Sequence, residues 1–187
     1  MRYDYQGKPG NLDIYQGMPE ELEVYTDSDW AGCKESRKST SGGIVSFGSH
    51  VVKSWSVTQK VIATSSAEAE YYAMVKGTSN ALGIRGILRD LGVIRKVRLN
   101  TDASAAKGIC NRKGLGKIRH LEVSQLWLQD KVNRGEVLVK KIRGDLNPAD
   151  ALTKGVNAVK LSQHMVSTSQ ELWSGRHELM PQVAVDE

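Results

Sequence analysis

The segment LEVYTDSDWAG, residues 22–32, decides the fold, because a short run of strand-forming residues ends in carboxylates and then turns. Residues 22–26 are mostly apolar or β-favouring, so we expect a strand there, with Asp27 where the strand gives way to a loop. An ionised carboxylate removed from water needs a cation or a metal as partner. Aspartate also begins turns through its own side-chain hydrogen bonds, so Asp27 taken alone does not separate a catalytic role from a structural one.

Three further acidic positions lie at the ends of expected elements. Glu70 lies near the start of a helix, Asp102 follows a strand, and Asp150 begins another helix. Four acidic side chains at element ends can converge on divalent cations. Together with Asp27 they predict a metal site.

Structural roles compete with the metal site at these positions. Ser65 and Glu68 have the spacing of a capping box, in which the glutamate bonds back to the amide of the cap residue. Glu70 lies two residues further on, on a different side of the helix, where the capping role is absent. Asp102 could cap the helix that follows it, and Asp150 falls at the third position of its helix, where an acid favours the helix dipole.

The order of the four acids, on a strand, a helix, a strand and a helix, resembles that of the ribonuclease H family of nucleic-acid-cleaving enzymes. More narrowly, the motifs resemble the ribonuclease H domain of copia-type retrotransposon polyproteins over residues 22–154. Several motifs in one order are more specific than any one of them. They are DSDWAG (27–32), RKSTSG (37–42), SSAEAEY (65–71), RH (119–120) and ADALTK (149–154).

This resemblance implies hydrolysis of phosphodiester bonds with two Mg²⁺ ions, for which Mn²⁺ can substitute. It implies that Asp27 bridges the two ions, that Glu70 and Asp102 complete one site, and that Asp150 helps to hold the other. Magnesium prefers oxygen ligands, which agrees with a site made of carboxylates.

The resemblance also implies an RNA/DNA hybrid as substrate and a covalently linked or associated reverse transcriptase as partner. A hybrid is recognised by its minor-groove shape, its 2′-hydroxyls and its phosphates. The basic stretch 112–120 either follows a nucleic-acid backbone or is a solvated linker, and residues 34–40 leave the same alternatives open. Relatives often carry a histidine in the loop at residues 143–146, where this chain has none. The role of His120 stays open between substrate contact and packing. The candidate nucleic-acid contacts are Lys38, Ser39, Thr40, Ser65, Ser104, Arg112, Lys113, Lys117, Arg119 and His120.

The bulk composition fits one domain with a full core, at 187 residues, 40% hydrophobic and 25% charged. A net charge of +5 and a pI near 9.2 suit a polyanionic partner, although proteins that bind no nucleic acid also reach such values. An apolar run of the roughly 20 residues that cross a bilayer is missing, as is a signal-peptide core. We therefore expect an intracellular protein without a membrane partner, located in the cytoplasm, a virus-like particle or the nucleus. Cys33 and Cys110 are expected to be reduced thiols.

The periodicity predicts a single α/β domain, and the resemblance implies that it is of ribonuclease H-like type. Its mixed five-stranded sheet has strands one to three antiparallel and strands four and five parallel to the first, and it is flanked by helices. Residues 1–21 form a lead-in, 22–166 the domain and 167–187 a loosely ordered tail. The expected strands cover 22–26, 43–47, 51–57, 97–101 and 136–142, and the expected helices 66–91, 103–111, 121–133 and 148–166.

The resemblance, together with the four acids, implies an endonuclease that cleaves the RNA strand of RNA/DNA hybrids during retrotransposon reverse transcription. One alternative is a nucleic-acid-binding module of the same fold without activity, against which the presence of all four acids argues. Another is a DNA-directed nuclease or integrase-like enzyme, which usually carries three acids.

Overall fold

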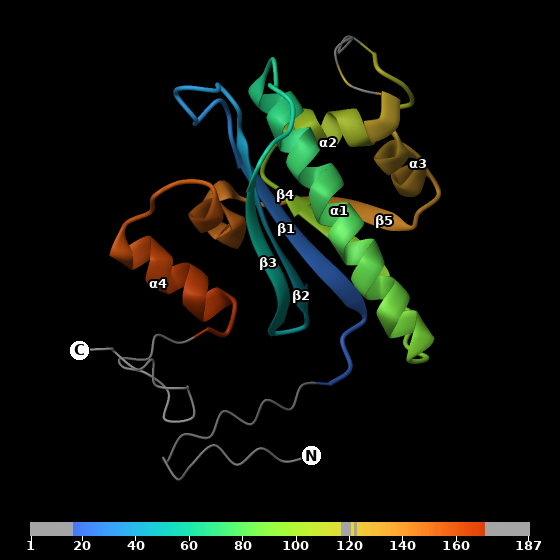
Figure 1. Cartoon of the computed structure of the whole chain (residues 1–187). Coiled ribbons are helices and arrows are strands. Elements are labelled where there is room, and N and C mark those ends of the chain that lie inside the picture. The colour runs from blue at the N-terminus through green and yellow to red at the C-terminus, as the bar shows by residue number, and fades with distance from the viewer. Residues whose placement is uncertain (1–16, 117–120, 122, 171–187) are drawn as a thin grey trace, which may run out of the picture.

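The computed structural model describes residues 17–116, 121 and 123–170. Its strands are β1 (Glu21–Asp29), β2 (Thr40–Phe47), β3 (His50–Thr58), β4 (Lys96–Thr101) and β5 (Val137–Lys141). They form one sheet in the order β3-β2-β1-β4-β5 (Figure 1). β1 to β3 pair antiparallel, whereas β4 runs parallel to β1 and β5 parallel to β4. The predicted mixed sheet and its strand directions are confirmed.

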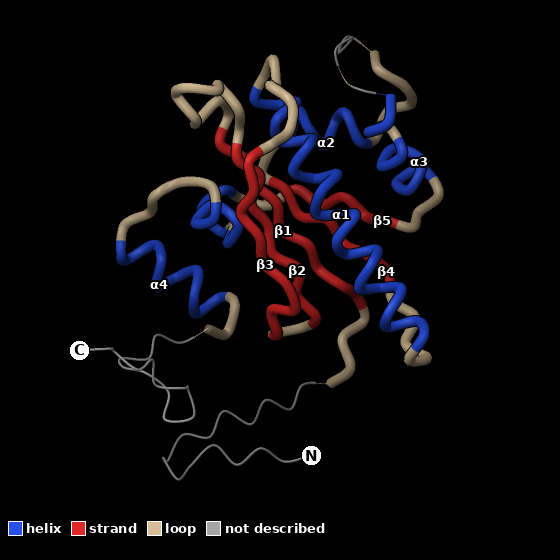
Figure 2. Tube along the Cα trace, in the orientation of Figure 1, coloured by secondary structure: helices blue, strands red, loops and turns tan. Residues whose placement is uncertain are grey.

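Helices cover both faces of this sheet, as the tube view in Figure 2 shows. The α-helices are α1 (Ser66–Asp90), α2 (Ser104–Cys110), α3 (Trp127–Asn133) and α4 (Ala158–Ser167). Three short 3₁₀ turns complete the described elements: η1 (Val123–Gln125), η2 (Gly144–Leu146) and η3 (Pro148–Leu152).

Two neighbouring glycines on β2 identify which element covers which face. Successive residues of a strand point to opposite faces. A Cβ on Gly43 would lie 2.1 Å from the ring of Trp55, and one on Gly77 of α1 would lie 3.5 Å from the same ring. A Cβ on Gly42 would instead lie 2.7 Å from Thr153, just after η3. α1 therefore covers one face of the sheet, and η3 covers the other.

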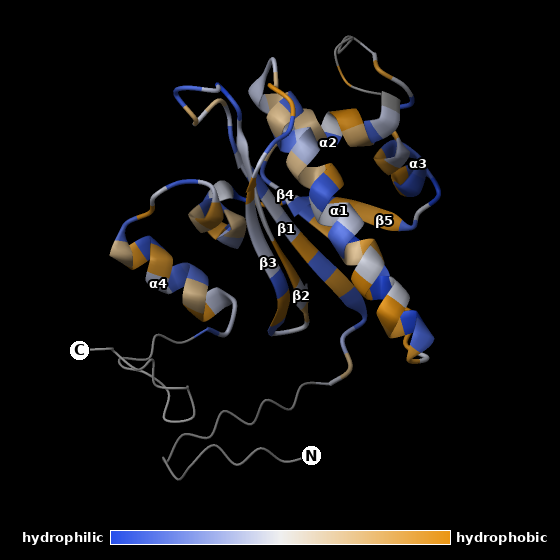
Figure 3. Cartoon of the chain, viewed as in Figure 1, coloured by the Kyte–Doolittle hydropathy of each residue, from blue (hydrophilic) through white to orange (hydrophobic). Residues whose placement is uncertain are grey.

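The core lies between α1 and the central strands. Along β1, Leu22 and Val24 are fully buried while Glu21 and Glu23, which alternate with them, are half-buried, an alternation that is visible in Figure 3. Small residues on α1 let the helix lie close to the sheet, since a Cβ on Gly77 would be 2.5 Å from Thr26. This close approach explains the glycine at position 77, and α1 continues through it and past Gly83 to Asp90.

The predicted helix over residues 148–166 is wrong, because the structure divides it into η3 and α4. Asn157 begins α4 by accepting a hydrogen bond from the Lys160 amide at 2.8 Å. The Thr153 hydroxyl turns inward and donates to Asp27. The predicted helix over 121–133 is also too long, since η1 precedes an α-helix that begins only at Trp127.

The remaining expectations have mixed outcomes. Both cysteines are free thiols, as predicted. Among the described residues, no helix is both long enough and apolar enough to span a bilayer. Residues 1–16 of the predicted lead-in and 171–187 of the predicted tail lie outside the described residues, so the division into lead-in, domain and tail stays a prediction.

Candidate metal centre

Three carboxylates from three elements meet at the carboxyl ends of the central strands. Asp27 belongs to β1, Glu70 to the second turn of α1, and Asp102 follows β4 directly. One oxygen of each lies within 4.8 Å of the others. The parallel pairing of β1 with β4 ends at Tyr25 and Asn100, so both aspartates project beyond the last shared pair. β1 itself continues along β2 to Asp29, which corrects the expectation that its strand ends before Asp27.

Burial and mutual repulsion disfavour the ionised forms of these acids. Burial raises the pKa of Glu70 to about 8, and the charges of Asp27 and Asp102 add to the rise, against a hydrogen bond from the Ser28 amide at 3.2 Å. The second oxygen of Glu70 is buried without a hydrogen-bond partner. Burial also raises the pKa of Asp27, although the hydrogen bond from Thr153 and the charge of Lys154 oppose it. A cation among the three groups would relieve both the repulsion and the unpaired oxygen.

The donor set therefore fits a hard divalent ion. Three carboxylates at this spacing offer oxygen ligands of the kind that Mg²⁺ takes, and they offer no nitrogen or sulfur. Gly144 in η2 closes against Asp102, because a Cβ there would lie 2.8 Å from Asp102 Oδ2. Bulk at position 144 would thus displace the Asp102 carboxylate.

The fourth predicted acid, Asp150, is buried but does not belong to this cluster. Lys154 pairs with its Oδ1 and Lys160 of α4 pairs with its Oδ2. Burial opposes its ionisation, but the two lysine hydrogen bonds outweigh burial and hold the pKa of Asp150 below its ordinary value. Both oxygens of Asp150 thus already carry a cationic partner.

The structure shows which of the competing structural roles Ser65, Glu68 and Asp102 have. Ser65 caps α1, as predicted, by accepting from the Glu68 amide at 3.2 Å. The Glu68 carboxylate does not return to Ser65; it accepts from the amide and hydroxyl of Thr64 and from the hydroxyl of Tyr72. Asp102 is not a cap, because α2 begins after Ala103 without a side-chain cap.

The predicted nucleic-acid contacts differ in their accessibility. Ser39 is fully buried and its hydroxyl accepts from the Ala31 amide at 2.9 Å, so it positions the loop rather than facing solvent. Arg112 is half-buried and donates to the Leu115 carbonyl at 2.7 Å. Lys113 and Ser104 are exposed, while Lys38, Thr40 and Ser65 are half-buried. Lys117, Arg119 and His120 lie outside the described residues.

Three site residues were not predicted from the sequence: Thr153, Lys154 and Lys160. Lys154 follows Asp150 by four residues, a spacing that suits an ion pair on a helix and could have identified it. Thr153 and Lys160 gave no local signal. They reach the site because the chain turns after η3 and then returns as α4.

Comparison with known proteins identifies relatives of this chain. The chain is 31% identical over 170 residues to the retrovirus-related Pol polyprotein from transposon TNT 1-94 of Nicotiana tabacum, covering 89% of this chain and 13% of that protein. It is 31% identical over 152 residues to the Pol polyprotein from transposon RE1 of Arabidopsis thaliana, covering 79% of this chain and 10% of that protein. The chain thus spans about a tenth of the length of these relatives. No family model matches it.

Solved structures show the same fold. LC11-RNase H1, isolated from compost, superposes with a TM-score of 0.50 at 17% identity, over 72% of this chain and 93% of the other. The N-terminal RNase H domain of Rv2228c from Mycobacterium tuberculosis also gives a TM-score of 0.50, at 15% identity, over 80% of this chain and 96% of the other.

Proposed function

We propose, from the chain's membership of the retrovirus-related Pol polyproteins of transposons and its ribonuclease H fold, that it is a metal-dependent ribonuclease H. Its substrate is the RNA strand of an RNA/DNA hybrid, and it acts beside a reverse transcriptase in a copia-type element. The observation that carries this proposal is the convergence of Asp27, Glu70 and Asp102 at the strand ends.

The three clustered carboxylates would hold a divalent ion, for which we propose Mg²⁺ with Mn²⁺ as a substitute. When bound, Mg²⁺ polarises a phosphate oxygen and lowers the pKa of a coordinated water. Thr153 orients Asp27 by donating to its Oδ2, and the Ser28 amide orients Glu70. Asp150 would hold a second ion once its oxygens are released by Lys154 and Lys160.

Lys154 also adds a positive charge beside the cluster. Its hydrogen bond to Asp150 raises its pKa, and the charges of Asp27, Asp150 and Asp102 raise it further against burial. The ammonium therefore stays protonated at neutral pH. A cation at this place attracts the phosphate of an approaching strand.

The test is incubation with end-labelled RNA/DNA hybrid, duplex DNA and duplex RNA, in Mg²⁺, Mn²⁺ or EDTA. We expect cleavage of the RNA strand of the hybrid, with 5′-phosphate and 3′-hydroxyl ends, only in the presence of a divalent ion. Persistent cleavage in excess EDTA would contradict the metal centre. Binding of the hybrid without cleavage would favour the inactive module, and equal cleavage of duplex DNA would favour a DNA-directed enzyme.

A further inference from the structure

Trp30 is unusually exposed for a residue so close to the carboxylates. It directly follows β1 and comes three residues after Asp27 in the sequence. About half of its surface, 53%, is accessible to solvent. Its indole N–H, the side chain's only polar group, already donates to the Ala63 carbonyl at 3.1 Å. The exposed part of the ring is therefore apolar surface.

A second exposed apolar residue is adjacent in sequence to the residue that Trp30 contacts. Ile62 directly precedes the residue that binds the indole, and it is 56% exposed. We call Trp30 and Ile62 the Trp30 shelf. The hydrogen bond across the shelf joins the β1–β2 loop to the segment before α1, the helix that carries Glu70. The shelf thus lies on the two parts of the chain that carry Asp27 and Glu70, two of the three clustered carboxylates.

The loop that carries Trp30 is held in one conformation. Ala31 and Arg37 adopt left-handed backbone angles, with φ of 55° and 56°, which residues other than glycine rarely do. The buried Ser39 hydroxyl accepts from the Ala31 amide, and Asp29 accepts from the Thr40 amide. Unfavourable backbone angles in a loop fixed by side-chain bonds are typical of binding sites.

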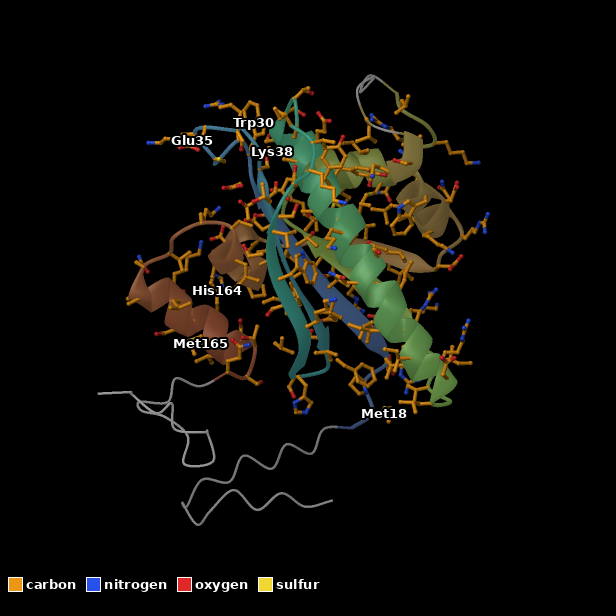
Figure 4. All side chains as sticks on the ribbon, viewed as in Figure 1. Met18, Trp30, Glu35, Lys38, His164 and Met165 are labelled. Carbon is orange, nitrogen blue, oxygen red and sulfur yellow. The ribbon has the colours of Figure 1, made fainter. Side chains whose placement is uncertain are left out.

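The same loop is basic. Lys34 and Arg37 are exposed and Lys38 is half-buried, against a single acid, Glu35. Figure 4 places Trp30, Glu35 and Lys38 together at one end of the molecule, on the side of the β1–β2 loop. Apolar ring surface among cations suits a nucleic-acid strand, whose sugars and bases are apolar and whose phosphates are anionic.

We propose that the Trp30 shelf is a subsite for the hybrid, in which the indole packs on the sugars of one strand in the minor groove. This inference rests on the proposed function and names where its substrate lies. Bases inside a hybrid are already stacked, so the surfaces left for the ring are the sugars displayed by the wide, shallow groove.

The first test compares steady-state cleavage by Trp30→Ala, Trp30→Phe and the control Ile87→Ala. Ile87 is 63% exposed and lies near the far end of α1, so it matches Trp30 in exposure but not in position. We expect Trp30→Ala to raise KM for the hybrid roughly tenfold at nearly unchanged kcat, and Trp30→Phe to retain most of the affinity. An unchanged KM in Trp30→Ala, or an equal rise in Ile87→Ala, would overturn the proposal.

The second test does not depend on cleavage. The metal-free protein is titrated with hybrid, with single-stranded DNA and with inorganic polyphosphate, and tryptophan fluorescence is followed in the wild type and in Trp30→Phe. We expect hybrid to change the emission, polyphosphate to leave it unchanged, and Trp30→Phe to lose the response. An equal response to polyphosphate, or a response confined to single-stranded DNA, would overturn the proposal. A Trp30-dependent response to hybrid without any cleavage would leave the shelf standing and remove the proposed ribonuclease activity.

Discussion

Replacing Glu70 with glutamine is expected to lower metal-supported cleavage by roughly a thousandfold while making the metal-free protein more stable. The amide oxygen is a weak ligand and brings no charge to balance the ion, which explains the loss of activity. The gain in stability arises because the folded protein disfavours ionised Glu70, whose second oxygen is buried without a partner. We expect a gain of about 1–3 kcal/mol at neutral to basic pH, or several degrees in Tm.

The sign of the pH dependence of this stability gain follows from the raised pKa of Glu70. Glu70 has an ordinary pKa of 4.5, which burial and the neighbouring carboxylates raise to about 8 in the folded protein. Below about pH 4.5 the group is protonated in both the folded and the unfolded states, so the substitution changes little. Between these values the unfolded chain ionises first, and the penalty on the folded state grows. The advantage of Glu70→Gln should therefore appear as pH rises through this window and be complete above about pH 8.

Glu68→Gln is the matched control, since the two glutamates lie two residues apart on α1. Glu68 accepts three hydrogen bonds from Thr64 and Tyr72, so the amide should cost about 1 kcal/mol of stability. Cleavage should persist. Thermal melts in EDTA and cleavage rates in Mg²⁺ separate the two residues. If Glu68→Gln were inactive and Glu70→Gln still cleaved the hybrid, the assignment of the metal ligand on α1 would be wrong.

Replacing Asp150 with asparagine is expected to lower both activity and stability. The amide cannot neutralise Lys154 and Lys160, which pair with its two oxygens. Because Asp150 is buried while the lysines are partly exposed, we expect a loss of about 2 kcal/mol. Cleavage should fall by about a hundredfold or more, since the proposed second ion would lose its charged ligand.

The contribution of Asp150 to stability depends on pH with the opposite sign to that of Glu70. The lysine hydrogen bonds outweigh burial and hold the pKa of Asp150 below its ordinary 3.8, so the pair stabilises the fold above that pH. The contribution is lost as pH falls through the lowered value. Asp145→Asn is the control, because Asp145 pairs with Arg143 at 2.7 Å on the surface and its loss should hardly change Tm. Equal melting temperatures for wild type and Asp150→Asn at neutral pH would contradict this account.

The sequence predicted the elements that carry the three clustered acids better than it predicted their surroundings. Asp27, Asp102 and Glu70 were accessible to prediction because strand ends and helix periodicity are local properties, and sheet topology then brings them together. The partners of Asp150 were not, because they depend on how the chain turns after η3. An apolar periodicity through residues 148–166 hides that turn, whereas the Asn157 cap and the inward Thr153 produce it.

The residues around the β1–β2 loop show the same difference between what local sequence reveals and what depends on tertiary contacts. Ser39 belongs to a polar, basic stretch and was predicted as a nucleic-acid contact, but its hydroxyl is needed to hold Ala31. Trp30 belongs to the motif that ends β1, yet its indole donates to the carbonyl of Ala63, 33 residues away. Residue type alone does not reveal which of two neighbouring polar or apolar side chains faces solvent.

The central claim, that Asp27, Glu70 and Asp102 form a metal centre, is tested most directly by calorimetric titration with Mn²⁺ in buffers of different ionisation enthalpy. Near pH 7, Glu70 with a pKa of about 8 is mostly protonated, so metal binding must displace its proton. We predict release of close to one proton per ion, falling toward zero above about pH 9, and weak binding without this release in Glu70→Gln. Binding heats that are independent of the buffer, or wild-type affinity and proton release in Glu70→Gln, would contradict the metal centre.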